Sequence, residues 1–190
     1  MDKRQESAIK KSGIFTLAQG KEIGLSQQDI SRLVAAKDLM RVGRGIYLHP
    51  DAKLDRDVGF QIASAKFGLE AAIGGLSALY HYNLVEQVPG QVWVLVPPEK
   101  RTRVRGYKLI RTKTTLDKEI VNEKGYRIVS VERAVLEGLK FITKIGERTA
   151  IKAARESLAN GQTTEMRLAK AANELGLESV LAKYLEVITP

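Results

Sequence analysis

The first part of the chain has apolar positions at helical spacing, interrupted by glycines, and this pattern predicts short helices. Residues 3–12 have helical spacing and are closed by Gly13. A second short segment begins at Thr16, a residue that can cap a helix, and runs to Ile23 before Gly24. Two short helices are therefore expected ahead of a third segment.

A third helix is predicted to begin after Ser26. Ser26 is a favourable N-cap, Asp29 follows three residues later as in a capping box, and Leu25 takes the hydrophobic-staple position. Three apolar residues at i, i+3 and i+4 should form a buried stripe: Ile30, Leu33 and Val34. The opposite face then points outward, and it carries Gln27, Gln28, Ser31, Arg32 and Ala35.

Two strand-like runs follow this helix and predict a small basic hairpin. They are residues 39–42 and 46–48, joined by the turn Gly43-Arg44-Gly45. Three helices and a hairpin in this order are typical of a winged helix-turn-helix, whose third helix has the size that the DNA major groove admits.

Pro50 and the polar stretch to Asp57 indicate a boundary, so we predict a winged helix-turn-helix domain at residues 1–50 and a second domain at 51–190. The expected strands of the second domain are 71–75, 91–96, 107–111 and 126–129, and its helices are 58–69, 76–84, 131–142, 144–159, 164–175 and 177–187. The predicted fold class is α+β, in which the second domain has a small mixed sheet of three or four strands and several helices.

Composition narrows the function. The sequence has 31 Lys and Arg against 22 Asp and Glu, a net charge of +9, which favours anionic partners. It contains no cysteine, which excludes disulfides, Cys-ligated zinc, iron–sulfur clusters and thiol catalysis. The start, MDKRQESAIKK, has no apolar signal-peptide core, and no run approaches the roughly 18 apolar residues of a membrane span. We therefore expect a cytoplasmic protein without a membrane partner.

The outward face of the third helix carries side chains suited to reading bases. Gln can bond adenine through two hydrogen bonds and Arg can bond guanine in the same way. The predicted base-reading residues are Gln27, Gln28, Ser31 and Arg32. The residues expected to approach the phosphate backbone, the last of them at the wing tip, are Thr16, Lys37, Arg41 and Arg44. The alternative is a solvated polar helix face, but the cap, the apolar stripe and the basic hairpin together favour binding to double-stranded DNA.

Two further basic features lie in the second domain. One is a run without acidic residues that holds Lys100, Arg101, Arg103, Arg105, Lys108, Arg111 and Lys113. The other is a stripe at helical spacing that holds Lys144, Arg148, Lys152 and Arg155. Either feature could extend a DNA footprint or bind RNA or an acidic protein, and either could be plain solvated surface, the reading favoured for the stripe.

Enzyme signatures are missing from the sequence. There is no P-loop, HExxH or GxSxG motif, and the histidines His49 and His81 lie far apart. Residues 74–77 faintly resemble the Gly-Ser turn of nucleotidyltransferases, but no Asp-x-Asp pair follows to hold metal ions. We predict a protein that is not an enzyme and has neither a metal site nor a cofactor. An enzyme would become the better interpretation if the structure placed His81 beside Glu70 in a pocket.

Three segments resemble the AbiEi antitoxins, the DNA-binding half of type IV toxin–antitoxin systems. The run GIFTLAQGKEIGLSQQDISRLVAAKDLMRVGRGIYLHPDA resembles their N-terminal domain, with its Gly-x-Phe-Thr opening and Arg-x-Gly-Arg-Gly-x-Tyr wing. AAIGGLSALYHYNLVEQVPGQVWVLV and IVSVERAVLEGL resemble the opening of the second domain and a Ser-x-x-Arg helix start. The resemblance extends from about residue 13 to residue 187.

The resemblance implies an autorepressor that binds inverted repeats in the promoter of its own operon and counters a toxin of nucleotidyltransferase type without a tight complex. By motif position, Gln27, Gln28, Ser31 and Arg32 take the recognition-helix role, and Arg41 and Arg44 take the wing role. The second domain would carry the antitoxic activity, and the chain is expected as a monomer or weak dimer. The competing hypothesis is an interaction protein whose basic second domain binds toxin, RNA or an acidic partner, with DNA binding secondary.

Overall fold

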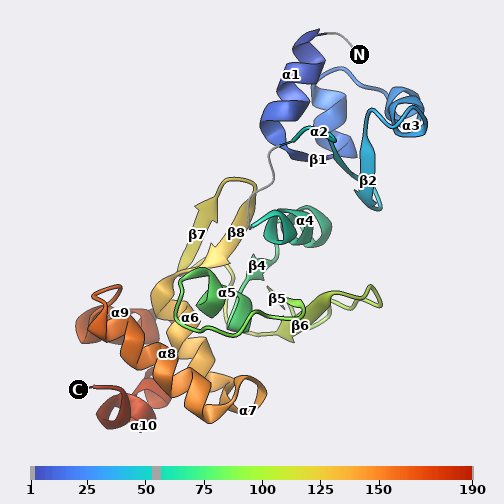
Figure 1. The fold of residues 1–190 in the computed structure, drawn as a ribbon. Coiled ribbons are helices and arrows are strands. Elements are labelled where there is room, and N and C mark those ends of the chain that lie inside the picture. The colour runs from blue at the N-terminus through green and yellow to red at the C-terminus, as the bar shows by residue number, and fades with distance from the viewer. Residues whose placement is uncertain (1–2, 53–56, 190) are drawn as a thin grey trace. The chain divides into compact units, whose positions relative to one another are not determined.

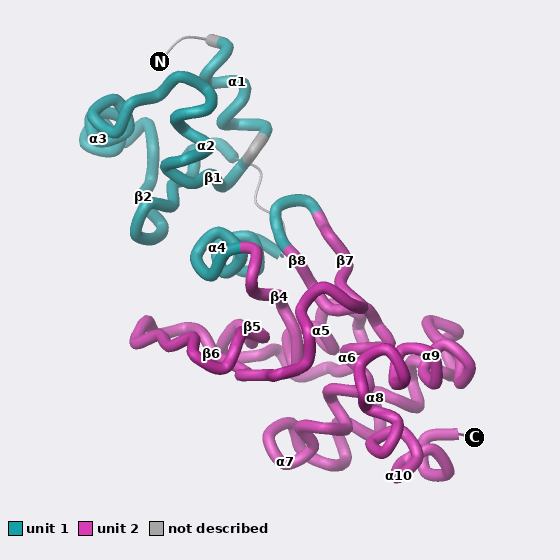
Figure 2. The backbone as a smooth tube through the Cα atoms, turned by 180° about the vertical axis from the view of Figure 1, so that it is seen from behind, with its two compact units in different colours: residues 1–68, 124–126 teal, residues 69–123, 127–190 magenta. Residues whose placement is uncertain are grey.

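The chain forms two compact units. The computed structural model describes residues 3–52 and 57–189. Contacts between residues divide the chain into two units (Figure 2). The first unit contains residues 1–68 and 124–126, and the second unit contains residues 69–123 and 127–190. The sequence pattern predicts a boundary after residue 50, whereas the contacts keep the helix that follows with the first unit.

The first unit contains the predicted helices and hairpin (Figure 1). Its elements are α1 (Lys3–Ser12), β1 (Ile14–Thr16), α2 (Leu17–Glu22), α3 (Gln27–Ala35), β2 (Met40–Gly43), β3 (Ile46–Leu48) and α4 (Val58–Phe67). The strands form an antiparallel sheet in the order β1-β3-β2. The short strand β1 was not predicted, because its pairing partner lies more than thirty residues further along the chain, with Ile14 opposite Leu48.

Local hydrogen bonds explain where α2 and α3 begin. The Thr16 hydroxyl accepts from the Gln19 amide, and the Gln19 side chain accepts from the Thr16 amide. Ser26 and Asp29 make the same reciprocal pair at α3, as predicted. Behind these caps lies a core that contains Ile9, Phe15, Leu25, Ile30 and Leu39, with Leu33 and Val34 packed against it. The predicted apolar stripe of the third helix is therefore confirmed.

The second unit is built on a mixed five-stranded sheet in the order β6-β5-β4-β8-β7. Its elements are β4 (Ala72–Ile73), α5 (Gly75–His81), β5 (Val92–Val96), β6 (Tyr107–Arg111), β7 (Ile120–Glu123), β8 (Tyr126–Val129), α6 (Val131–Lys140), α7 (Ile142–Ile145), α8 (Glu147–Ala159), α9 (Glu165–Leu175) and α10 (Glu178–Ile188). The mixed sheet is confirmed, but it has one strand more than expected. Strand β7 was missed because three of its four residues are exposed and lack an apolar pattern.

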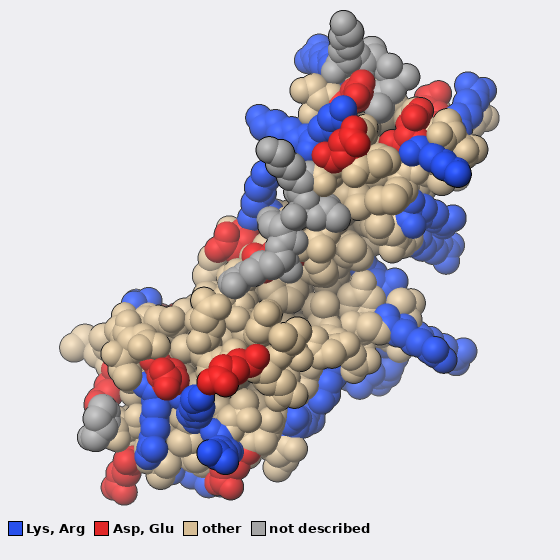
Figure 3. All heavy atoms as spheres, viewed as in Figure 1, with Lys and Arg blue, Asp and Glu red and all other residues tan. Residues whose placement is uncertain are grey.

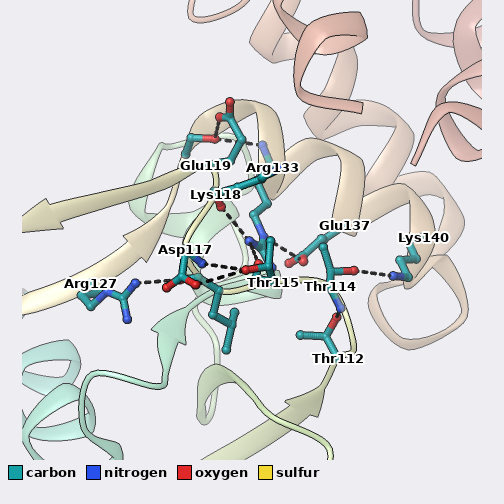
Figure 4. Close-up of polar contacts among 12 residues, drawn as sticks. Thr112, Thr114, Thr115, Asp117, Lys118, Glu119, Arg127, Arg133, Glu137 and Lys140 are labelled. Carbon is teal, nitrogen blue, oxygen red and sulfur yellow. Dashed lines mark hydrogen bonds and ion pairs between the residues drawn. The ribbon is translucent and has the colours of Figure 1, made fainter. Parts of the chain in front are cut away.

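Helix α6 lies at the centre of the second unit and contacts α5, α8, α9 and α10. Its residues 132–139 are all buried, including Arg133 and Glu137. Arg133 holds the loop between β6 and β7, because its Nη1 donates to the carbonyls of Thr115 at 2.6 Å and Lys118 at 2.7 Å (Figure 4). The Ser130 hydroxyl accepts a hydrogen bond from the Arg133 amide and so caps α6. The Ser-x-x-Arg segment thus combines a helix cap with a buried arginine that bonds the loop between β6 and β7.

The Gly74-Gly75-Leu76-Ser77 segment is a packing motif. A Cβ atom at Gly75 would lie 2.6 Å from Cε3 of Trp93, and Gly75 has a φ of +52°. The Ser77 hydroxyl accepts from the Trp93 amide at 2.9 Å. These contacts bring the start of α5 against β5, which accounts for the glycines without any nucleotide chemistry.

Candidate nucleic-acid interface

The structure brings the four predicted base-reading residues together on α3. Gln27, Gln28, Ser31 and Arg32 are exposed, and they line one open hollow of about 850 Å³. Ser26 and Lys21 complete the lining. Within residues 3–52 and 57–189, no hydrogen bond or ion pair engages the side-chain amides of Gln27 and Gln28 or the guanidinium of Arg32. Their donors and acceptors face solvent, which is what a base-reading surface requires.

The other polar groups at the start of α3 are already bonded within the helix. The Asp29 carboxylate accepts from the Ser26 amide at 3.0 Å and from the Ser26 hydroxyl at 2.5 Å. The Ser31 hydroxyl donates to the Gln27 carbonyl at 2.9 Å, so Ser31 offers only lone pairs to a ligand. These bonds hold the carboxylate of Asp29, the acidic residue of α3, at the start of the helix.

The Ser26 hydrogen bonds lower the pKa of Asp29. A carboxyl whose folded pKa lies below its unfolded value of about 3.9 contributes stability that is complete above that value and lost as the pH falls through the folded pKa. We therefore expect Asp29→Asn to flatten the loss of stability below about pH 4, while its effect between pH 5 and pH 8 stays constant. Urea unfolding followed by circular dichroism across pH tests this. If the stability of parent and variant changed with pH in parallel, Asp29 would not be the source of the loss of stability below about pH 4.

The wing carries Arg44 at its tip. The turn is tied to the start of α2 by the Leu17 amide, which donates to the Gly45 carbonyl at 2.9 Å. Arg44 is exposed, and Arg41 lies along the wing with its Nε donating to the Gly43 carbonyl at 3.2 Å. The hydroxyl of Thr16 is engaged with Gln19 in the α2 cap, where it accepts at 3.3 Å and donates at 3.1 Å. Thr16 thus serves first as a capping residue.

Lys37 follows the C-cap of α3, Ala36, and has a left-handed conformation with a φ of 64°. This conformation costs an L-residue about 1–2 kcal/mol, and Asn adopts it more readily than Lys. We expect Lys37→Asn to raise the free energy of unfolding by about 0.5–1 kcal/mol and to weaken DNA binding, because a cation is lost. The matched variant Lys37→Ala should weaken binding equally without the gain in stability. Urea titration and fluorescence anisotropy test the pair, and a gain in DNA affinity in either variant would contradict the assigned role.

Lys21 was missed by the sequence reasoning. It lies in the last turn of α2, is exposed, and shares the hollow with Gln27, Gln28 and Arg32. A lysine on the helix before the predicted base-reading helix is a sequence signal for phosphate contact, because in a helix-turn-helix that earlier helix crosses the DNA backbone. Its position relative to α3 depends on how α2 and α3 pack, which the local sequence pattern does not reveal.

The basic run of the second unit is partly occupied by contacts within the chain. Arg101 Nη1 donates to the Pro98 carbonyl, Arg111 Nε donates to the Lys100 carbonyl at 3.0 Å, and Lys108 Nζ lies 3.8 Å from the centroid of the Trp93 ring. Lys100 Nζ lies 3.7 Å from a carboxylate oxygen of Glu70. For Arg103, Arg105 and Lys113 the described part of the chain supplies no such partner. Figure 3 shows Lys and Arg side chains projecting from the surface of the protein.

The predicted basic stripe is not one helix face. Gly146, with a φ of 100°, separates α7 from α8, so Lys144 lies on a different helix from the other stripe residues. Lys152 Nζ lies 2.9 Å from Glu86, an ion pair that raises the pKa of Lys152 and lowers the pKa of Glu86. Arg155 Nε donates to the Val187 carbonyl at 2.8 Å. The prediction of one continuous stripe was wrong, because a left-handed glycine breaks the helical phase.

The described residues contain no group of three or more His, Cys, Asp or Glu side chains that could hold a metal ion. The two histidines are in separate surroundings: His49 Nδ1 accepts from the Asp51 amide at 3.1 Å, and the His81 ring lies against Tyr82. Glu70 faces Lys100. No helix in the described ranges has the length and apolar character needed to cross a membrane.

Two comparisons found similar proteins, one over the first unit and one over nearly the whole chain. Residues 5–50 match the family described as transcriptional regulator, AbiEi antitoxin. The crystal structure of the RV2827C protein from Mycobacterium tuberculosis is similar over 97% of this chain and 79% of that chain, with a TM-score of 0.62 and 12% sequence identity. At this identity the likeness concerns the fold alone. No curated protein sequence matches the chain.

The family match spans the winged helix from α1 to the end of the wing, and so includes the hollow on α3 and Arg44. Transcriptional regulators of this kind are DNA-binding proteins and are not typically enzymes. The resemblance inferred from the N-terminal residues is therefore confirmed: residues 5–50, the winged-helix region of this chain, match the model of the AbiEi antitoxin transcriptional regulators.

Proposed function

We propose that this protein is an antitoxin that represses its own operon by binding double-stranded operator DNA through the winged helix. The observation that carries the proposal is the exposed hollow on α3, where the side-chain hydrogen-bonding groups of Gln27, Gln28 and Arg32 lie beside Lys21 and have no partner among the described residues. These residue types bond base edges in the major groove. We assign DNA binding to residues 1–50 and antitoxic activity to residues 51–190.

In this proposal α3 enters the major groove, and the cations around it contact phosphates. An α-helix with its side chains is about 10–12 Å in diameter, which fits the major groove width of about 12 Å, and the nine residues of α3 extend roughly 13 Å along it. Lys21, Lys37, Arg41 and Arg44 lie on the helix before α3, at its end and on the wing, so they can reach the backbone on both sides of the groove. The net charge of +9 supplies affinity that is independent of base sequence.

The experiment that tests DNA binding is footprinting of the full-length protein on the promoter upstream of its own gene. Protection of two inverted half-sites whose centres lie about one or two helical turns apart, of roughly 34–36 Å each, would support the proposal. Equal affinity for the promoter and for a scrambled duplex at physiological salt would contradict it, since it would leave only charge-driven binding.

The antitoxic part of the proposal is supported by the family resemblance. Its expected partner is a toxin of nucleotidyltransferase type, countered without a stable complex, and the protein itself is expected as a monomer or weak dimer. Co-expression of the full chain with a neighbouring toxin of that type should restore growth. Continued growth arrest at matched protein levels would remove the antitoxin function and leave the DNA-binding function intact.

A further inference from the structure

Strand β6 lies at one edge of the five-stranded sheet, and within the described residues no other strand pairs with its outer side. It runs parallel to β5, with Val92 opposite Tyr107 and Val96 opposite Arg111. The Val92 amide donates to the Gly106 carbonyl and the Thr112 amide donates to the Val96 carbonyl. Alternate residues of a parallel strand bond the same neighbour, so even-numbered residues face β5, and Leu109 and Arg111 direct their backbone N–H and C=O groups outward.

Positive side chains flank this edge at both ends. Arg103 and Arg105 precede β6, Lys113 follows it, and all three are exposed. The neighbouring cations are held within the chain, because Arg111 and Arg101 donate to carbonyls and Lys108 lies on the Trp93 ring. The edge thus combines outward backbone hydrogen-bonding groups with cations that have no partner in the described part of the chain.

These two features identify the occupant by its chemistry. Outward backbone groups recognise an extended polypeptide, which adds to the sheet as a further strand. A second copy of this chain paired antiparallel through the same edge would place Arg105 of one copy near Lys113 of the other, and like charges in such positions repel. Carboxylates at the ends of the added strand would instead face these cations.

We propose that the outer edge of β6 binds an extended acidic segment of a partner protein. This interaction is separate from DNA binding by the winged helix and does not depend on it. The proposal assigns a role to Arg103, Arg105 and Lys113, for which neither the fold of the second unit nor the interface on α3 provides one.

The test uses the ¹⁵N-labelled full-length protein and a synthetic peptide of about nine residues, with Glu pairs at both ends and alternating Val and Thr between them. In the free protein the amides of Leu109 and Arg111 should exchange with solvent quickly, whereas the Thr112 amide is already bonded to β5. Peptide binding should slow exchange at Leu109 and Arg111 by about tenfold or more and leave Thr112 unchanged. A peptide with Pro at its centre lacks a ladder donor and should not bind.

A charge variant provides the second measurement. The double variant Arg105→Glu with Lys113→Glu should lower the affinity for the peptide by about tenfold or more, because the attraction between the flanking charges becomes repulsion at both ends. The matched control is Lys183→Glu on α10, an exposed lysine away from β6, which should bind the peptide as the parent does. Unchanged DNA affinity in both variants would show that the first unit is intact.

Three outcomes would overturn the proposal. One is the absence of any peptide-induced change in the spectrum of β6. Another is equal binding of the Pro-containing peptide, which would mean charge attraction without strand addition. The third is a single-stranded RNA or duplex DNA that perturbs Arg103, Arg105 and Lys113 without protecting the Leu109 and Arg111 amides, which would make this a nucleic-acid surface instead.

Discussion

Replacing Arg133 with Met is expected to lower the free energy of unfolding by about 3–5 kcal/mol, the usual cost of removing one partner of a buried ion pair. Arg133 and Glu137 both have side chains that are 0% exposed, and Arg133 Nε lies 3.0 Å from Glu137 Oε1. Without the guanidinium, the buried carboxylate loses its counter-ion and the carbonyls of Thr115 and Lys118 lose their donor. Burial already raises the pKa of Glu137, and Arg133 opposes that rise.

The double variant Arg133→Met with Glu137→Leu distinguishes the loss of a charge partner from the loss of packing. Replacing both members of a buried pair by apolar residues is often neutral or stabilising, so the double variant should recover the part of the stability lost to the unpaired carboxylate, while the carbonyls of Thr115 and Lys118 stay without their donor. The matched control is Lys152→Met, which breaks an ion pair whose side chains are 55% and 92% exposed and should cause no measurable change. Urea unfolding gives all the values. A double variant as unstable as Arg133→Met alone would contradict the explanation.

Replacing Arg32 with Ala is expected to reduce the preference for operator over random DNA by about 1–3 kcal/mol, or roughly 5- to 150-fold. Arg32 lies in the α3 hollow with its guanidinium directed to solvent, where it can bond a guanine edge. Arg44→Ala should instead weaken binding to both DNAs similarly and lower the salt dependence by about one unit, because in the proposed complex the wing tip contacts phosphate. The two arginines thus separate base reading from backbone binding.

Fluorescence anisotropy with the operator and a scrambled duplex, at several salt concentrations, measures both effects. Arg148→Ala provides a matched control, since Arg148 is an exposed arginine on α8 in the second unit and should leave both affinities unchanged. Identical losses on operator and random DNA for Arg32→Ala and Arg44→Ala would contradict this division of roles.

Arg32 and Arg133, the residues replaced in the two main predictions, differ in how well the sequence reveals their roles. Arg32 follows from helical spacing, because the apolar stripe on one side of α3 places it on the other. Arg133 has the same local signature as any charged residue near a helix start. Nothing in its neighbourhood along the chain indicates that α5, α8, α9 and α10 surround α6 or that the loop at residues 112–119 lies over its guanidinium.

The sequence by itself determined the features that depend on neighbours within a few residues. These are the Thr16 cap of α2, the capping box of α3, the apolar stripe, the Gly-flanked wing, the placement of Gln27, Gln28, Ser31 and Arg32 on one helix face, and the N-terminal motifs that resemble the matched family. Capping and helical periodicity act over three or four residues, so they can be read along the chain.

Only the tertiary structure decided the pairing of β1 with β3, the position of Lys21 in the α3 hollow and the break between α7 and α8. It also decided that β6 forms an edge of the sheet and which cations have partners within the chain. Strand pairing and burial depend on residues that lie far apart in sequence, and their free energy arises only when the units pack. The same physical rule therefore explains both why α3 and its outward face could be predicted and why the surface of the second unit could not.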